Sequence, residues 1–238
     1  MIIAPSLLAA DFSQLKKEIL RVEKAKADWL HLDIMDGHFV PNISFGPAVV
    51  QMARPLTRLF FDVHLMCSRP EILLEPFAQA GADQIIIHIE LGEQITSLIW
   101  KIKSLGKKVG LAINPSTTMA SLEPHLDKID SILIMTVNPG FGGQPFITET
   151  LPKVQQAFFW RAEKNLHYKI EVDGGINFQT AAECARAGAD TCVAGTGLFG
   201  ERSLTRAVKQ MRTIAEKNPP RPDFKFDANK GFLIASES

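Results

Sequence analysis

The sequence predicts a parallel α/β barrel in which eight strand–helix units close into a ring. Short apolar segments rich in β-branched residues alternate with helix-like segments about eight times along the 238 residues, which is typical of a parallel sheet with helical crossovers. The pattern Ala-x-Ala-Asp joins a helix end to the next strand at 25–28, 80–83 and 187–190. This number of units indicates a closed (β/α)8 barrel. The alternative, an open doubly wound sheet, would leave the first and last strands as edges.

The predicted strands are short apolar runs bounded by polar or turn-forming residues. They cover residues 2–6, 28–35, 58–65, 83–88, 108–114, 130–137, 169–173 and 190–195. The predicted helices begin at a capping residue such as Asp11, or at a proline such as Pro47, which the first turn tolerates. They cover residues 12–26, 47–52, 71–80, 93–105, 116–125, 149–164, 177–187 and 203–217. In the repeated junctions, glycine suits the left-handed end of a helix.

No internal boundary interrupts this alternation, so residues 1–217 are predicted to form one barrel domain. The segment at 218–222, Asn-Pro-Pro-Arg-Pro, cannot continue a helix. Residues 218–238 are therefore predicted to form a C-terminal tail, anchored by Phe224, Phe226 and Phe232.

The charge balance argues against nucleic acids and membranes as partners. Lys and Arg total 26, Asp and Glu total 26, and the formal net charge is zero, which removes the broad attraction that polyanions need. The N-terminus has no signal-peptide pattern, and no apolar run reaches transmembrane length. Cys67, Cys184 and Cys192 lack CxxC spacing, which indicates a reducing compartment. We expect a cytoplasmic protein.

Two predicted strands end in an acid, an imidazole and a thioether on one face. The sequences are His-Leu-Asp-Ile-Met at 31–35 and Asp-Val-His-Leu-Met at 62–66, and alternate residues of a strand share a face. Since sites on such barrels lie at the carboxyl ends of the strands, His31, Asp33, His64 and Asp173 should meet. Two imidazoles and two carboxylates suit Zn²⁺, Fe²⁺, Mn²⁺ or Co²⁺. The alternative is that each residue is a hydrogen-bonded polar strand end.

Three glycine-rich turns follow the last three predicted strands, at 139–143, 174–175 and 195–197. Glycine lets backbone N–H groups converge on an anion, and phosphate sites near the last strands recur in barrels. These turns therefore predict a phosphate site. The alternative is that glycine only permits tight turns.

The chain resembles the ribulose-phosphate 3-epimerase family. The resemblance runs from Ile-Ala-Pro-Ser at 3–6 to the helix ending near 217, with matching motifs at 31–42, 62–66, 135–146 and 171–175. It implies a (β/α)8 barrel, a phosphosugar substrate and a place in the pentose phosphate pathway. It also implies one divalent metal ion (Zn, Fe, Mn or Co) held by His31, Asp33, His64 and Asp173.

The resemblance also implies roles for individual residues. Asp33 and Asp173 would be the acid/base pair that moves the proton at carbon 3, through a metal-stabilised enediolate, between D-ribulose 5-phosphate and D-xylulose 5-phosphate. Ser6 and His64 would touch the substrate. The phosphate end would be held by Gly140, Phe141, Gly142, Gly143, Gly174, Gly175, Gly195 and Thr196.

Other functions remain open from the sequence. The stretch at 160–170 and the run at 197–199 are similar to the hexulose-phosphate 3-epimerases, which makes D-allulose 6-phosphate an alternative substrate. The residues at 88–90 are His-Ile-Glu where the family usually has His-Pro-Glu. A barrel aldolase or decarboxylase would use a lysine at a strand end, and no predicted strand end carries one. A non-catalytic phosphosugar-binding barrel would not need two carboxylates around a metal.

The loop after the second predicted strand is apolar and should be covered. Its apolar residues are Phe39, Val40 and Ile43, followed by Phe45 and Val49. The loop could fold over its own barrel, or it could dock against a second copy in a self-complementary interface. The resemblance favours a homo-oligomer, a dimer or a hexamer.

Overall fold

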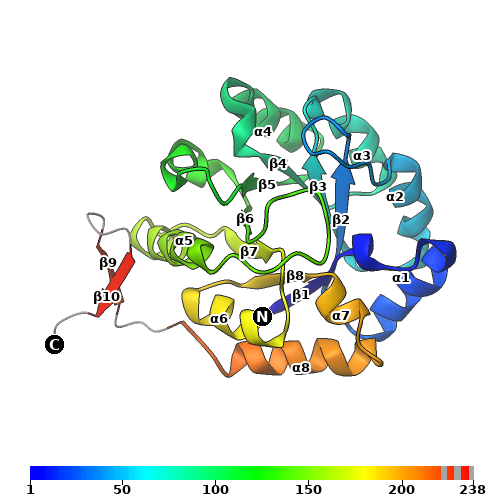
Figure 1. The fold of residues 1–238 in the computed structure, drawn as a ribbon. Coiled ribbons are helices and arrows are strands. Elements are labelled where there is room, and N and C mark those ends of the chain that lie inside the picture. Colours follow the sequence, from blue (N-terminus) through cyan, green and yellow to red (C-terminus); the bar gives the residue numbers. More distant parts are fainter. Residues whose placement is uncertain (221–223, 228–231, 236–238) are drawn as a thin grey trace.

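The computed structural model describes residues 1–220, 224–227 and 232–235, the last two ranges as backbone only. Eight parallel strands form one sheet in the order β1-β8-β7-β6-β5-β4-β3-β2. An isolated parallel bridge between Ser6 and His31 joins β1 to β2, so the sheet closes into a ring (Figure 1). The predicted barrel is confirmed, and the open-sheet alternative is wrong. The strands are β1 (Ile2–Pro5), β2 (Trp29–Met35), β3 (Phe60–Met66), β4 (Gln84–His88), β5 (Lys108–Ile113), β6 (Ser131–Met135), β7 (Lys169–Asp173) and β8 (Thr191–Ala194).

Helices surround this ring on the outside (Figure 1). They are α1 (Leu15–Lys24), α2 (Pro47–Ala53), α3 (Leu74–Ala80), α4 (Ile95–Ser104), α5 (Leu151–Glu163), α6 (Phe178–Ala187), α7 (Thr196–Phe199) and α8 (Leu204–Glu216). The outward side chains of the strands and the inward faces of the helices form one continuous apolar core. A second, smaller apolar cluster fills the inside of the ring. Its buried members are Ala4, Ile86, Ala112, Leu133, Met135 and Val193.

One predicted helix is wrong. Residues 116–125 form no α-helix but contain the 3₁₀ segments Met119–Ser121 and Glu123–Lys128. Pro124 explains the difference, because proline has no N–H and its ring clashes with the preceding turn of an α-helix. Four other predicted helices begin with 3₁₀ turns, at Phe12–Gln14, Pro70–Ile72, Ile89–Gln94 and Thr148–Thr150, before the α-helix starts.

The repeated Ala-x-Ala-Asp junctions lie at the amino end of the barrel. Gly81 and Gly188 end α3 and α6 in the left-handed conformation, each with φ of 111°. The glycine caps predicted from the sequence are therefore confirmed. In the first junction Lys26 occupies the same left-handed region with φ of 56°.

Four aspartates, three of them from these junctions, each tie two consecutive strands together, in an arrangement that we call an aspartate clamp. The aspartate's backbone N–H donates to the carbonyl of one residue near the start of the preceding strand, and its carboxylate accepts the N–H of that same residue. The pairs are Asp28 with Ile3, Asp83 with Phe61, Asp130 with Val109 and Asp190 with Ile170. The carboxylate bonds measure 2.8, 2.7, 2.8 and 2.9 Å in that order. The clamps therefore follow each odd-numbered strand of the barrel.

Beyond the barrel, β9 (Phe224–Asp227) and β10 (Phe232–Ala235) form an antiparallel hairpin. It lies outside the ring of helices next to α5 (Figure 1). The sequence predicted a tail there and did not predict these strands. The side chains of Phe224, Phe226 and Phe232, which were predicted to anchor the tail, lie outside the described part of the chain. Among the described helices, none has the length and apolar character needed to cross a membrane.

Candidate active site

The four residues predicted to hold a metal lie together at the carboxyl ends of β2, β3 and β7. Parallel pairing sets Asp33 opposite His64. The Asp33 Oδ1 atom lies 3.2 Å from His31 Nε2 and 3.0 Å from His64 Nδ1. With Asp173, the four residues offer one ligand atom each, all within 4.8 Å of one another.

This donor set fits a divalent cation. Two ligands bonded at about 2.0–2.1 Å to one tetrahedral ion lie about 3.3 Å apart, and both imidazole nitrogens lie close to that distance from Asp33 Oδ1. Nitrogen and oxygen donors without thiolate suit Zn²⁺, Fe²⁺, Mn²⁺ and Co²⁺ alike. His31 and His64 are fully buried, so the ligand atoms are held in place by the surrounding barrel.

The two carboxylates of the site have pKa values displaced in opposite directions. Burial opposes ionisation of Asp33, but the charge of His31 and hydrogen bonds from His31 and His64 hold its pKa well below the usual range. Burial, together with the negative charge of Asp33, raises the pKa of Asp173 to about 7. Among the protein groups alone, Asp33 is therefore the ionised member of the pair, and Asp173 is the member that holds its proton until the pH rises through about 7.

The two imidazoles also differ. Burial opposes protonation of His31, but Asp33 and Asp62 raise its pKa well above the ordinary value. Burial lowers the pKa of His64 to about 4, and His88 contributes to the lowering. A cation at Asp33 would therefore displace a proton from His31 and find His64 already neutral.

A buried polar network supports the site from inside the barrel. The His31 Nδ1–H donates to Asp62 Oδ2 at 2.7 Å. The Gln84 amide lies 2.8 Å from Asp62 Oδ1 and 3.0 Å from Glu171 Oε1. Burial and the charge of Asp62 raise the pKa of Glu171 well above its usual range, which favours the protonated form of this carboxyl. The predicted site did not include Asp62, although its alternation with His64 along one strand was the available signal.

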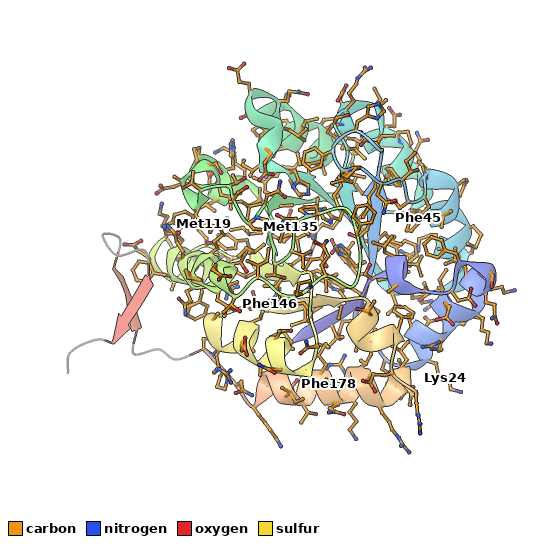
Figure 2. All side chains as sticks on the ribbon, in the orientation of Figure 1. Lys24, Phe45, Met119, Met135, Phe146 and Phe178 are labelled. Atoms are coloured by element: carbon orange, nitrogen blue, oxygen red, sulfur yellow. The ribbon has the colours of Figure 1, made fainter. Side chains whose placement is uncertain are left out.

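An open cavity lies above these groups, and the atom-free space in it, together with the solvent at its mouth, is ≈ 580 Å³. Its apolar wall contains three methionines, each at most 4% exposed: Met35, Met66 and Met135. Figure 2 shows Met135 near the centre of the ring, whereas Phe45 and Phe178 lie further out. No lysine or arginine is among its described lining residues. The cavity is thus a pocket with carboxylates at its floor and no basic side chain in its wall.

The cavity is lined by every residue of the predicted site except two. The predicted residues that line it are Ser6, Asp33, Gly140, Phe141, Gly142, Gly143, Asp173, Gly174, Gly175, Gly195 and Thr196. His31 and His64 lie behind the wall. The Ser6 hydroxyl donates to Asp33 Oδ2 at 2.6 Å, so it positions the carboxylate from the cavity side.

The glycines of the three turns differ in whether packing requires them. A Cβ at Gly174 would lie 2.3 Å from Val137, and one at Gly175 would lie 2.6 Å from the Phe146 backbone. Tight packing therefore explains these two glycines. At Gly142 a Cβ would meet no atom within 4 Å, and the backbone is not left-handed. Neither packing nor strain requires glycine at that position, where the chain lines the cavity.

Side chains of the β2–α2 connection bind two neighbouring loops by hydrogen bonds. The Asp36 carboxylate accepts backbone N–H groups from His38 and Phe39, and from Ser68 of the next connection, each at 2.7–2.8 Å. The Asn42 amide donates to the Gly140 carbonyl at 2.7 Å. These bonds join the loop after β2 to the loops after β3 and β6.

The sequence comparisons agree with one another. A profile of the "Ribulose-phosphate 3 epimerase family" matches residues 2–199. The chain is similar to a ribulose-phosphate 3-epimerase of Synechocystis, with 45% identity over 92% of this chain and 96% of the relative. It is also 45% identical to that of Bacillus subtilis, over 88% of this chain and 97% of the relative. A chloroplastic ribulose-5-phosphate-3-epimerase of Arabidopsis thaliana is 43% identical over 92% of this chain and 78% of the relative.

Solved structures with low sequence identity share the fold. KGPDC from Streptococcus mutans in complex with D-R5P has a TM-score of 0.70 and 14% identity, covering 91% of this chain and 97% of that one. The 3-hexulose-6-phosphate synthase of Salmonella typhimurium has a TM-score of 0.67 and 14% identity, covering 92% of this chain and 100% of that one. At such identities the likeness shows the barrel alone.

Proposed function

Because the chain belongs to the ribulose-phosphate 3-epimerase family, we propose that it epimerises D-ribulose 5-phosphate to D-xylulose 5-phosphate with Asp33 and Asp173 as its acid/base pair. The observation that carries these roles is a pair of carboxylates, Asp33 buried and Asp173 partly buried, with opposed pKa shifts, both facing one cavity. Epimerisation next to a ketone removes a proton from one face of carbon 3 and delivers one to the other face. It therefore needs one ionised and one protonated group.

In the forward direction Asp33 takes the proton and Asp173 delivers one, and in the reverse direction the roles exchange. Ser6 holds the Asp33 carboxylate in orientation through the 2.6 Å hydrogen bond to Oδ2. The wall of Met35, Met66 and Met135 excludes water from the reacting carbon without supplying a competing ligand or proton. His31, Asp33, His64 and Asp173 would hold a divalent cation, which would supply Lewis-acid stabilisation of negative charge developing on the substrate.

The phosphate end of the substrate is assigned to backbone N–H groups of the turns at 140–143 and 195–196. Three features support this assignment. The described lining of the cavity contains no lysine or arginine, and a Cβ at Gly142 would meet open space. A Cβ added at Gly143 would lie 3.8 Å from the Thr196 methyl group, so the two turns are close to each other. His64 is assigned to the cation alone, because it lies behind the cavity wall.

Exchange of the carbon-3 proton with solvent tests the reaction. Ribulose 5-phosphate incubated with the enzyme in D₂O should incorporate deuterium at carbon 3 as xylulose 5-phosphate forms. A phosphosugar-binding barrel without catalytic activity would incorporate no deuterium.

Relative turnover on ribulose 5-phosphate and allulose 6-phosphate decides the substrate, and faster turnover of the hexulose would overturn the pentulose assignment. Elemental analysis of protein purified without added metal identifies the native ion.

We also propose a homodimer formed by the apolar surface beside the site. Ile43 is 75% exposed and Phe12 is 47% exposed, and Phe12 packs edge-on against Phe45. Val40 instead packs inward with Met35 and Met66, so the loop covers its own barrel and still presents apolar side chains outward. Light scattering should return about twice the 26.3 kDa chain mass, and a monomer at micromolar concentration would refute the dimer.

The three cysteines, unpaired and buried, support a cytoplasmic location.

A further inference from the structure

The two ligand imidazoles face Asp33 through different nitrogens. His31 presents Nε2 and His64 presents Nδ1. A ring nitrogen that binds a cation carries no proton, so in each neutral ring the other nitrogen is the N–H donor. Both rings are fully buried, and each of these N–H groups therefore needs an acceptor inside the protein.

The two acceptors are of different kinds. His31 donates from Nδ1 to the Asp62 carboxylate. His64 donates from Nε2 to another imidazole, His88 Nε2, at 2.8 Å. His88 can accept there only when its own proton is on Nδ1, and that Nδ1 lies 3.0 Å from Glu90 Oε2. The hydrogen bonds thus run in one direction, from His64 through His88 to Glu90.

Glu90 ends this chain because both of its oxygens must accept. Oε1 accepts the backbone N–H of Asn114 at 2.8 Å, while Oε2 accepts from His88. Burial opposes ionisation of Glu90, but hydrogen bonds from His88, Thr117 and the Asn114 backbone lower its pKa to about 2. Glu90 is therefore ionised and accepts a hydrogen bond at each oxygen. The Asn114 backbone N–H can only donate, so the group next to it, at the position of Oε1, must be an acceptor.

His88 has no solvent alternative to these partners. It is fully buried, its ring stacks on His64 at 5.0 Å between centroids, and Phe39 covers it at 4.6 Å. A change in the proton position on His88 therefore has to be passed on to His64.

We propose that Glu90, acting through His88, is a positioning residue that keeps His64 in the one tautomer able to bind the cation through Nδ1. This inference rests on the proposed metal site and extends it by two residues that touch neither cation nor substrate. Outer partners of metal-ligating histidines fix the tautomer and ring orientation, and their loss typically weakens metal binding by about 10- to 100-fold.

The sharpest variant is Glu90→Gln, which keeps the shape and changes one acceptor into a donor. The Asn114 N–H requires the amide oxygen, so the amide NH₂ faces His88 and favours the reversed tautomer. His88 Nε2–H then opposes His64 Nε2–H, and His64 relieves the clash only by moving its proton to the ligand nitrogen. We expect about 10- to 100-fold weaker Co²⁺ and Zn²⁺ binding, measured by competition with a chromophoric chelator.

Two substitutions at His88 separate polarity from packing. In His88→Gln the amide oxygen can accept from His64 while the NH₂ donates to Glu90, so metal affinity should stay close to the wild-type value. His88→Leu removes the acceptor and should weaken binding as much as Glu90→Gln. The matched control is Tyr168→Phe, which removes another buried hydrogen bond, from Tyr168 to the Ala157 carbonyl, away from the site. That variant should bind metal as the wild type does.

The visible absorption spectrum of the Co²⁺-loaded protein provides a second measurement, since it reports the ligand field rather than turnover. Weaker binding with a changed spectrum in Glu90→Gln and His88→Leu, and neither effect in His88→Gln and Tyr168→Phe, supports the proposal. Wild-type affinity and spectrum in Glu90→Gln overturn it, as does equal weakening in Tyr168→Phe. A wild-type protein that binds neither ion would instead overturn the proposed metal site itself.

Discussion

The two ends of the barrel use the same residue type in opposite ways. At the amino end, Asp28 and Asp190 accept backbone N–H groups of the preceding strand and pair with Arg212 and Arg161. At the carboxyl end, Asp33 and Asp173 face imidazoles, each other and an open cavity. Carboxylates bound to the backbone fix the positions of strands, whereas carboxylates left facing a cavity can exchange protons. The function of each aspartate here depends on which groups its carboxylate oxygens contact.

The largest expected effect is at the carboxyl end. Asp173→Asn should lower kcat by about 100- to 10,000-fold, the contribution of a positioned acid/base group, and should abolish deuterium incorporation at carbon 3. Asp190→Ala, at the other end, is the matched control and should keep kcat per folded molecule. Intact turnover in Asp173→Asn would remove this residue from the mechanism.

A smaller effect is expected in the phosphate-binding turn. Gly142→Val should raise KM by about 10- to 100-fold, since the side chain displaces an anion whose hydrogen bonds are each worth about 1.5–3 kcal/mol. The melting temperature should stay near the wild-type value because a Cβ meets no atom there. Gly46→Val, at another position with open space, is the control. Wild-type KM in Gly142→Val, or a larger effect from removing a nearby lysine or arginine, would contradict the backbone assignment.

At the amino end the effect should fall on stability and spare activity. Asp190→Ala removes the acceptor of the Ile170 N–H and an acceptor of the Arg161 guanidinium, which keeps its hydrogen bond to the Tyr168 carbonyl. We expect the free energy of unfolding to fall by about 1–3 kcal/mol, measured by urea denaturation, with KM and kcat unchanged. A loss of activity without a loss of stability would contradict the division between the two ends.

The smallest effect concerns pH. Burial opposes ionisation of Asp36, but N–H groups of Phe39, Ser68 and His38 lower its pKa to about 2. A depressed folded-state pKa stabilises the protein above the unfolded value of about 3.9, and this contribution is lost as pH falls through the folded value. The stability difference between wild type and Asp36→Asn should therefore shrink between about pH 4 and pH 2 in urea titrations. A difference that does not change over that interval would contradict this role.

Most of the barrel could be predicted because the alternation of apolar runs and helix-like segments is a local signal. The cluster of side chains able to hold a metal could be predicted because period-two spacing places His31 and Asp33 on one face. The prediction of an α-helix at 116–125 was wrong because Pro124 disfavours an α-helix despite the helix-like pattern of this segment. His88 and Glu90 were visible as strand-end residues, but their hydrogen bonds to His64 and Asn114 depend on neighbouring strands and loops. Likewise, the clamp at Asp130 does not have the Ala-x-Ala-Asp pattern and appears only in three dimensions.

The aspartate clamps also bear on how the chain reaches its folded state. Their partners lie only 25, 22, 21 and 20 residues apart, so each clamp closes a short loop at a small entropic cost. Local contacts of this kind favour rapid folding, and each strand–helix–strand quarter of the barrel can form during synthesis as soon as its second strand leaves the ribosome. Among the described strand pairs, only that of β8 with β1 joins the two ends of the barrel sequence. We therefore expect ring closure to be the late step of folding.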